Sequence, residues 1–225
     1  MRFLQRITQV LKAIGLPLFV CTLCLGSLDN LFSQQMHNEM QSAEGLNAAV
    51  WFYGLGSLVV SVLSPVVASL LVIYGDRLRD KVTLADFLHK FINAALIEQV
   101  RSLGKILSWS LLLIFPAFIK FLQLSFVTFV VALDPEYWRG SRDALIASTR
   151  TANRHLLSTS LWLLLLGLLP ALLMTSLDEY QILWLHPLSA MFLYVIETLT
   201  TTALMLALLD IWQRSQKGAY YGADI

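Results

Sequence analysis

The sequence predicts an all-α, polytopic integral membrane protein with about six membrane segments, two of them forming a short proline-centred hairpin, and two cytoplasmic amphipathic helices. Three observations lead to this prediction. Of the 225 residues, 57% are hydrophobic and 14% are charged, whereas about 25% are charged in an ordinary soluble domain. Several apolar runs reach the length of about 20 residues that a helix needs to cross a bilayer. Nearly all lysines and arginines lie between these runs.

No linker, low-complexity tract or internal repeat divides the chain, so we expect a single membrane domain over residues 1–225. Its segments are expected near residues 13–33, 48–75, 103–119, 120–136, 155–177 and 184–210. The second segment is the clearest, because it contains no charged residue. The first follows three basic residues and no cleavage site comes after it, which favours a retained helix over a signal peptide.

The distribution of lysine and arginine predicts the orientation, because positively charged loops stay on the cytoplasmic side. Three precede the first segment, six lie between the second segment and residue 106, four follow residue 133, and two are near the C-terminal end. If residues 106–133 turn back near Pro116 to Lys120, all fifteen lie on one side. We therefore expect the bacterial inner (cytoplasmic) membrane, cytoplasmic N- and C-termini, and only Lys120 at an outer tip.

The arms of the predicted hairpin are short compared with the thickness of a bilayer. Each arm of about 14 residues reaches only about 21 Å at about 1.5 Å per residue, less than the hydrocarbon core of about 30 Å. Three arrangements of residues 106–133 therefore stay open, namely a full hairpin, a re-entrant loop and one helix kinked at Pro116.

Two stretches, residues 83–100 and 139–156, are expected to form amphipathic helices on the membrane. In the first, Thr83 and Asp86 have the spacing of a capping box. In the second, steps of 100° place one set of residues opposite Ala144, Leu145, Ser148 and Ala152. This set includes the arginines that we expect to contact anionic lipid head groups, namely Arg139, Arg142, Arg150 and Arg154. Cytoplasmic anchoring alone would also place arginines here, and both interpretations stay open.

One ordered set of features suggests a family. The third hydrophobic segment contains Pro116, the fourth ends at Asp134, and "ALIAS", Ala144 to Ser148, precedes the fifth. In this order the chain resembles a bacterial group of six-helix membrane proteins that includes the YciC-like proteins and the membrane domain attached to some glycerophosphodiester phosphodiesterases. The resemblance covers about residues 100–175. It implies a six-helix membrane domain, mostly without assigned activity, and the phosphodiesterase catalytic domain has no counterpart in the sequence.

Within the membrane segments, Glu197 and Lys120 are the polar candidates. Glu197 lies near the middle of the last segment, where an ionisable side chain costs about 2.5 to 3.5 kcal/mol on insertion scales and usually faces a protein interior or water cavity. The surrounding "ETLTTT" offers hydroxyl groups that can bond a protonated carboxyl or a neighbouring helix. Two interpretations of Glu197 stay open. In the functional one it is a proton or cation relay or a polar contact for a lipid head group, and in the other it is a neutral glutamic acid that forms hydrogen bonds between packed helices.

The sequence contains no recognisable catalytic constellation. Its four histidines are scattered, and no nucleophile, phosphate-binding or dinucleotide motif occurs. We therefore expect no enzyme activity, no catalytic, cofactor-binding or metal site, and no nucleic-acid partner. The expected function is that of a component or assembly partner of a cell-envelope complex, in contact with anionic membrane lipids and a membrane-protein partner. The alternative is a carrier for a lipid or small solute that uses Glu197.

Overall fold

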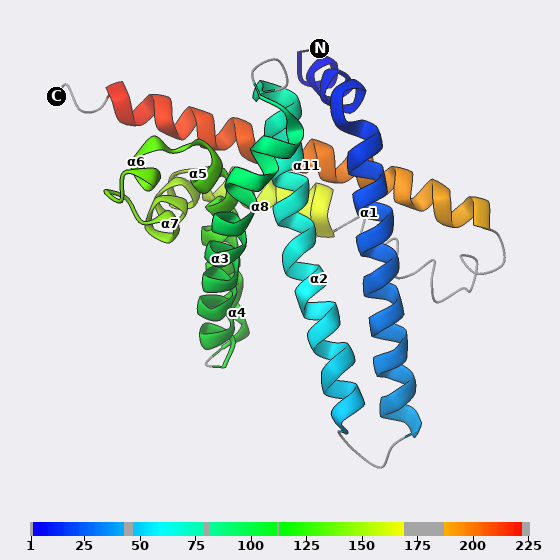
Figure 1. Cartoon of the computed structure of the whole chain (residues 1–225). Coiled ribbons are helices and arrows are strands. Elements are labelled where there is room, and N and C mark those ends of the chain that lie inside the picture. The colour runs from blue at the N-terminus through cyan, green and yellow to red at the C-terminus, as the bar shows by residue number, and fades with distance from the viewer. Residues whose placement is uncertain (1, 43–46, 79–81, 112, 169–186, 222–225) are drawn as a thin grey trace.

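The computed structural model describes residues 2–42, 47–78, 82–111, 113–168 and 187–221 of the chain (Figure 1). Every regular element within these ranges is a helix, as the sequence predicts. In chain order the helices are α1 (Arg2–Ser42), α2 (Ala48–Ile73), η1 (Tyr74–Leu78), α3 (Leu84–Ser110), α4 (Ile114–Leu124), α5 (Val127–Leu133), α6 (Pro135–Trp138), α7 (Ala144–Arg154), α8 (Leu156–Leu163), η2 (Leu164–Leu168) and α11 (Pro187–Tyr221). The end of the predicted segment 155–177 and the start of 184–210 lie outside the described residues.

Four helical stretches are long and apolar enough to cross a bilayer. They are Phe3–Gln41, Ala48–Arg77, Ile114–Leu133 and Phe192–Gln216. A helix of about 20 residues matches a hydrocarbon core of about 30 Å. Within the described ranges, the structure therefore confirms an all-helical chain with four helices of membrane-spanning length.

The first two helices lie side by side and run in opposite directions (Figure 1). α2 begins after Asn47, whose side-chain oxygen accepts a hydrogen bond from the N–H of Val50 at 2.9 Å. This bond satisfies one of the free donors in the first turn of α2. Close packing of the pair depends on Gly56, because a Cβ at this position would lie 3.0 Å from the ring of Phe32 in α1.

The last helix, α11, crosses both helices of this pair (Figure 1). Near its start, the ring of Tyr194 lies so close to Gly26 of α1 that a Cβ there would come within 2.8 Å of it. Further along, Asp210 pairs with Arg6 at the other end of α1. The stretch between them, residues 204–209, is buried in the core. α11 therefore contacts α1 at two widely separated levels.

The third helix starts where the sequence predicts and runs further. The hydroxyl oxygen of Thr83 accepts a hydrogen bond from the N–H of Asp86 at 3.3 Å, and the hydroxyl donates to the Asp86 carboxylate at 2.6 Å. α3 then continues without a break to Ser110. The predicted surface helix over residues 83–100 is therefore the first part of a 27-residue helix that also forms the first arm of the hairpin.

The hairpin reverses direction between Ser110 and Ile114, and the predicted turn near Pro116 to Lys120 is wrong. Pro116 is the third residue of α4. A proline in the first helical turn costs no hydrogen bond, because the N–H groups of that turn have no partner within the helix. Pro116 therefore lies at the start of the second arm. The boundary predicted between segments 103–119 and 120–136 falls inside α4.

A serine from a distant helix stabilises the break between α4 and α5. The fully buried Ser148 of α7 accepts a hydrogen bond from the N–H of Phe126 at 3.1 Å and donates one to the C=O of Gln123 at 2.7 Å. α5 follows directly and is buried at every residue from Val127 to Ala132. Ser148 therefore connects α7 to the joint between α4 and the buried helix α5.

The predicted amphipathic helix over residues 139–156 is shorter in the structure. α7 starts after Asp143, whose carboxylate accepts hydrogen bonds from the N–H groups of Leu145 and Ile146 at 2.9 and 3.2 Å. Before it, Gly140 has a φ of 72°, in the left-handed region that favours glycine. The predicted face is indeed buried, namely Ala144, Leu145, Ser148 and Ala152. It packs against the protein, mainly α4 and α5.

Replacing Ser148 with alanine should destabilise the fold, because the buried N–H of Phe126 and C=O of Gln123 would lose this partner. We expect the free energy of unfolding to fall by about 1 to 3 kcal/mol, measured by titration with a denaturing detergent in mixed micelles. Thr149→Ala is the matched control, since the hydroxyl of Thr149 donates to the C=O of Leu145 within its own helix. An equal loss in both variants would contradict this role of Ser148.

Candidate functional site

One arginine near the start of α1 joins three helical elements. Arg6 of α1 donates to both carboxylate oxygens of Asp76 in η1, at 2.6 and 2.7 Å, and also pairs with Asp210 of α11. The Asp76 side chain is only 8% exposed. A bidentate arginine–carboxylate pair has both strength and a defined geometry, and removing one partner would leave a buried charge without compensation. The cluster of Arg6, Asp76 and Asp210 is called the charged end below.

A second network joins α3 to the segment before α7. Arg101 of α3 pairs with Glu98 at 3.0 Å and with Asp143 at 2.7 Å. The hydrogen bond to Asp143 raises the pKa of Arg101. Burial raises the pKa of Asp143, but the hydrogen bonds from Arg101 and from two backbone N–H groups of α7 outweigh it, so this pKa lies below its ordinary value. Asp143 therefore both caps α7 and attaches it to α3.

Two of the four arginines predicted to contact lipid lie before α7, in different environments. Arg142 pairs with the buried carboxylate of Asp134 at 2.9 Å and with Glu136 at 2.6 Å. Arg139 is exposed, and no ion pair to it occurs within the described part of the chain. Arg142 therefore stabilises the turn before α7, whereas the charge of Arg139 faces outward.

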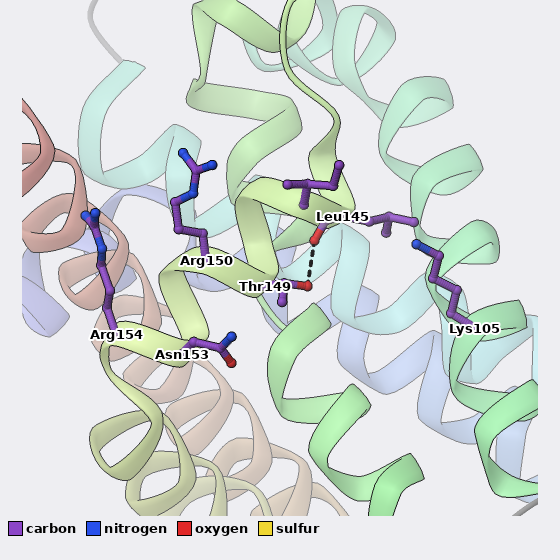
Figure 2. Close-up of a pocket in the computed structure, with 7 residues that line it drawn as sticks. Lys105, Leu145, Thr149, Arg150, Asn153 and Arg154 are labelled. Atoms are coloured by element: carbon purple, nitrogen blue, oxygen red, sulfur yellow. Dashed lines mark hydrogen bonds between the residues drawn. The ribbon is translucent and has the colours of Figure 1, made fainter.

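The other two arginines line an open cleft between α3 and α7 (Figure 2). The cleft encloses about 510 Å³ and is lined by Lys105 of α3 and by Leu145, Ile146, Thr149, Arg150, Asn153 and Arg154 of α7. Arg150 and Arg154 extend in the same direction from α7, and the side chain of Lys105 is directed toward α7 (Figure 2). Lys105 and the two arginines therefore line one open space, which we call the basic cleft.

Lys105 was not among the residues predicted for this site. It belongs to α3, and helical periodicity within residues 139–156 contains no information about a residue on another helix. The only signal in the sequence was its position at the end of the charged part of α3, directly before the apolar run that starts at Ile106.

Lys120 lies within α4, and the prediction that it occupies the tip of the hairpin is wrong. Its ammonium group donates to the side chain of Gln123 at 2.8 Å and lies 5.6 Å from the ring centre of Trp109 in α3. Gln123 donates in turn to Asn153 of α7 at 2.9 Å. A cation near an aromatic face is stabilised by the ring quadrupole. Lys120 therefore contacts the other arm of the hairpin and is linked to α7 through Gln123.

Glu197 borders a narrow niche where α1, α2 and α11 meet. The niche has about 10 Å³ of accessible space, and Thr22, Ser64 and Thr201 contribute its hydroxyl groups. This is about the volume that one water molecule needs. The neighbouring threonines do not donate to the carboxyl group as the sequence suggested. The hydroxyls of Thr198, Thr200 and Thr202 instead donate to backbone carbonyls one turn earlier in α11, as is common for threonine in a helix.

Over its described residues the protein is therefore an all-helical chain with four helical stretches of membrane-spanning length, a charged end and a basic cleft. No family model, curated protein or solved structure matches the chain. A function for it must therefore be argued from its own residues.

The attachment of α7 to α3 should depend on pH. A carboxylate whose pKa is lowered in the folded protein contributes stability above its unfolded pKa, about 3.9 for aspartate, and loses this contribution as the pH falls through the folded value. Asparagine at position 143 would keep the helix cap and remove the charge. Because Arg101 is exposed, we expect Asp143→Asn to be less stable than the wild type by at most about 1 kcal/mol at neutral pH.

The measurement is thermal unfolding of both proteins in detergent as a function of pH. The difference between them should stay constant from neutral pH down to about pH 5 and shrink below about pH 4. A difference that grows on acidification would have the wrong sign and would exclude the ion pair as its cause.

Proposed function

We propose that this protein is a multi-pass protein of the bacterial inner membrane that acts by binding, as a component or assembly partner of a cell-envelope complex. The proposal rests chiefly on an ordered, exposed tryptophan beside an outward-facing arginine. Trp138 is 48% exposed, yet its indole N–H donates to the C=O of Val131 at 2.8 Å and its ring packs edge-on against Phe91. Arg139 follows directly. Tryptophan and arginine are enriched among the residues that dominate protein–protein interfaces.

The charge distribution supports a placement in the membrane. Residues 13–28 of α1 and 48–75 of α2 contain no charged side chain, and α2 exposes large apolar side chains such as Trp51 and Phe52. The network around Arg6 joins the start of α1, the end of α2 and the C-terminal half of α11 at the charged end. Because positively charged segments stay in the cytoplasm, we place the charged end and both termini on the cytoplasmic side.

The geometry of α3 and α4 favours a re-entrant hairpin over two full crossings of residues 103–136. Between Lys105 and Ser110 the first arm rises about 7.5 Å, and between Ile114 and Lys120 the second rises about 9 Å, at about 1.5 Å per residue. The hydrocarbon core is about 30 Å thick. Neither apolar stretch between a lysine and the tip is therefore long enough to cross the core. The resemblance to the six-helix YciC-like proteins stays a prediction.

The re-entrant hairpin can be tested by cysteine labelling in a chain whose native Cys21 and Cys24 are replaced by alanine. A cysteine introduced at Leu111, which is 87% exposed on the protein, should react with an impermeant thiol reagent from neither side of an intact membrane. It should react after solubilisation. Ser141→Cys should be labelled from the cytoplasmic side and Gln41→Cys from the outer side. Labelling at position 111 from the outer side would show a full hairpin instead.

The binding function predicts a protein partner that depends on the surface at Trp138 and Arg139. The chain should be purified in native-membrane nanodiscs, and the proteins that remain in stoichiometric amounts identified by mass spectrometry. We expect Arg139→Glu to reduce retention of that partner about tenfold or more, because a reversed charge within an interface costs about 1.4 kcal/mol or more.

The matched control for this experiment is Arg214→Glu, a charge reversal at another exposed arginine, located on α11. Retention should be unchanged in this variant. If no protein remains in stoichiometric amounts with the wild-type chain, or if both reversals weaken retention equally, the proposed function is wrong.

A further inference from the structure

The basic cleft differs from the other charged clusters of the molecule. Elsewhere in the described part of the chain, seven ion pairs join arginines to carboxylates, including those of Arg6, Arg101 and Arg142. Within the described ranges, no carboxylate pairs with Lys105, Arg150 or Arg154. Like charges around one concave space raise the local positive potential and attract an anion. The charges of this cleft therefore favour a negatively charged ligand.

The polar contacts available in the cleft suit a phosphate ester. Arginine presents a planar fork of N–H donors that matches phosphate oxygens, and lysine adds a compact point charge. Asn153 uses its side-chain oxygen to accept the hydrogen bond from Gln123 at 2.9 Å. Its amide N–H groups remain available to a ligand. The volume of about 510 Å³ lies within the range of small-molecule sites, about 300 to 1,000 Å³.

The apolar surroundings distinguish a lipid from a free phosphate. The floor of the cleft includes Ile146, whose side chain is 60% exposed. Beyond Lys105, the same side of α3 continues toward the hairpin tip with Trp109, four residues further on and 41% exposed, and Leu111, the first residue after the helix, is 87% exposed. A ligand with an anionic head group and an acyl chain could cover both surfaces at once, whereas inorganic phosphate would cover only the first.

We infer that the basic cleft binds one anionic phospholipid, with its phosphate between Lys105, Arg150 and Arg154 and an acyl chain along the exposed face of α3. This inference rests on the proposed placement of the chain in the membrane. It differs from general attraction of basic residues to a negative surface, because it assigns one lipid to one cleft. The charge of Arg139, which lies outside the cleft, plays no part in it.

The test uses the full-length protein in neutral detergent micelles with phosphatidylglycerol as the probe, and native mass spectrometry to count bound lipid. We expect one phosphatidylglycerol to bind in preference to phosphatidylcholine. Each of Lys105→Gln, Arg150→Gln and Arg154→Gln should weaken its binding about fivefold, since a basic residue near anionic lipid contributes about 1 kcal/mol. Arg139→Gln, which removes one exposed positive charge close by, should leave the affinity unchanged.

Several results would overturn the inference. Equal loss of affinity in Arg139→Gln and Arg150→Gln would show diffuse surface attraction instead of a site. Glycerol phosphate binding as tightly as phosphatidylglycerol would show that the acyl chain makes no contact, and the cleft would then be a site for soluble phosphate esters. Equal binding of phosphatidylcholine would show that the cleft does not distinguish lipids by the net charge of their head groups.

Two further measurements test the lipid site without variants and test the membrane placement independently of it. If circular dichroism shows that a variant has lost helicity, the wild-type protein is instead cross-linked to a photoreactive phosphatidylglycerol. Cross-linked peptides that include neither residues 105–111 nor residues 145–154 would overturn the inference. Alkaline extraction of cell membranes tests the membrane placement alone. A chain released by alkali would overturn that placement, whereas a retained chain without lipid selectivity would overturn only the lipid site.

Discussion

The pairing of Arg6 with Asp76 and Asp210 is the interaction on which the rest of the arrangement depends. It joins residues separated by 70 and 204 positions in the chain and holds together the start of α1, the end of α2 and the C-terminal half of α11. Two carboxylates so close together would repel each other without the guanidinium between them. The uncharged stretches of α1 and α2 extend away from this polar point side by side.

Local signals in the sequence were sufficient for helices and caps, and insufficient for the hairpin. The long uncharged run of α2 and the cap at Thr83 depend only on neighbouring residues, and the structure agrees with both. Pro116 is compatible with a turn and with the first turn of a helix, since proline is tolerated in either. The choice between them depends on how α3 and α4 pack against each other, and a single sequence does not contain that information.

The same division applies to the candidate site. Arg150 and Arg154 share one face of α7 because they are four residues apart, which periodicity reveals. Arg142 looked equivalent on that helical projection, but Gly140 interrupts the helix and leaves Arg142 close to Asp134. Lys105 is brought to the cleft by the packing of α3 against α7. Residues within one helix were therefore predictable, and residues that meet through a turn or across two helices were not.

The position of α7 connects the buried core to the proposed lipid site. Ser148 attaches α7 to the joint between α4 and α5 inside the protein, and Asp143 attaches it to α3, while Arg150 and Arg154 face the basic cleft. A lipid bound there would contact α3 and α7 together and would neutralise charges that otherwise repel each other. A ligand that binds only the folded state stabilises it by mass action. Anionic lipid would therefore strengthen the same contact between α3 and α7 that Asp143 and Arg101 make.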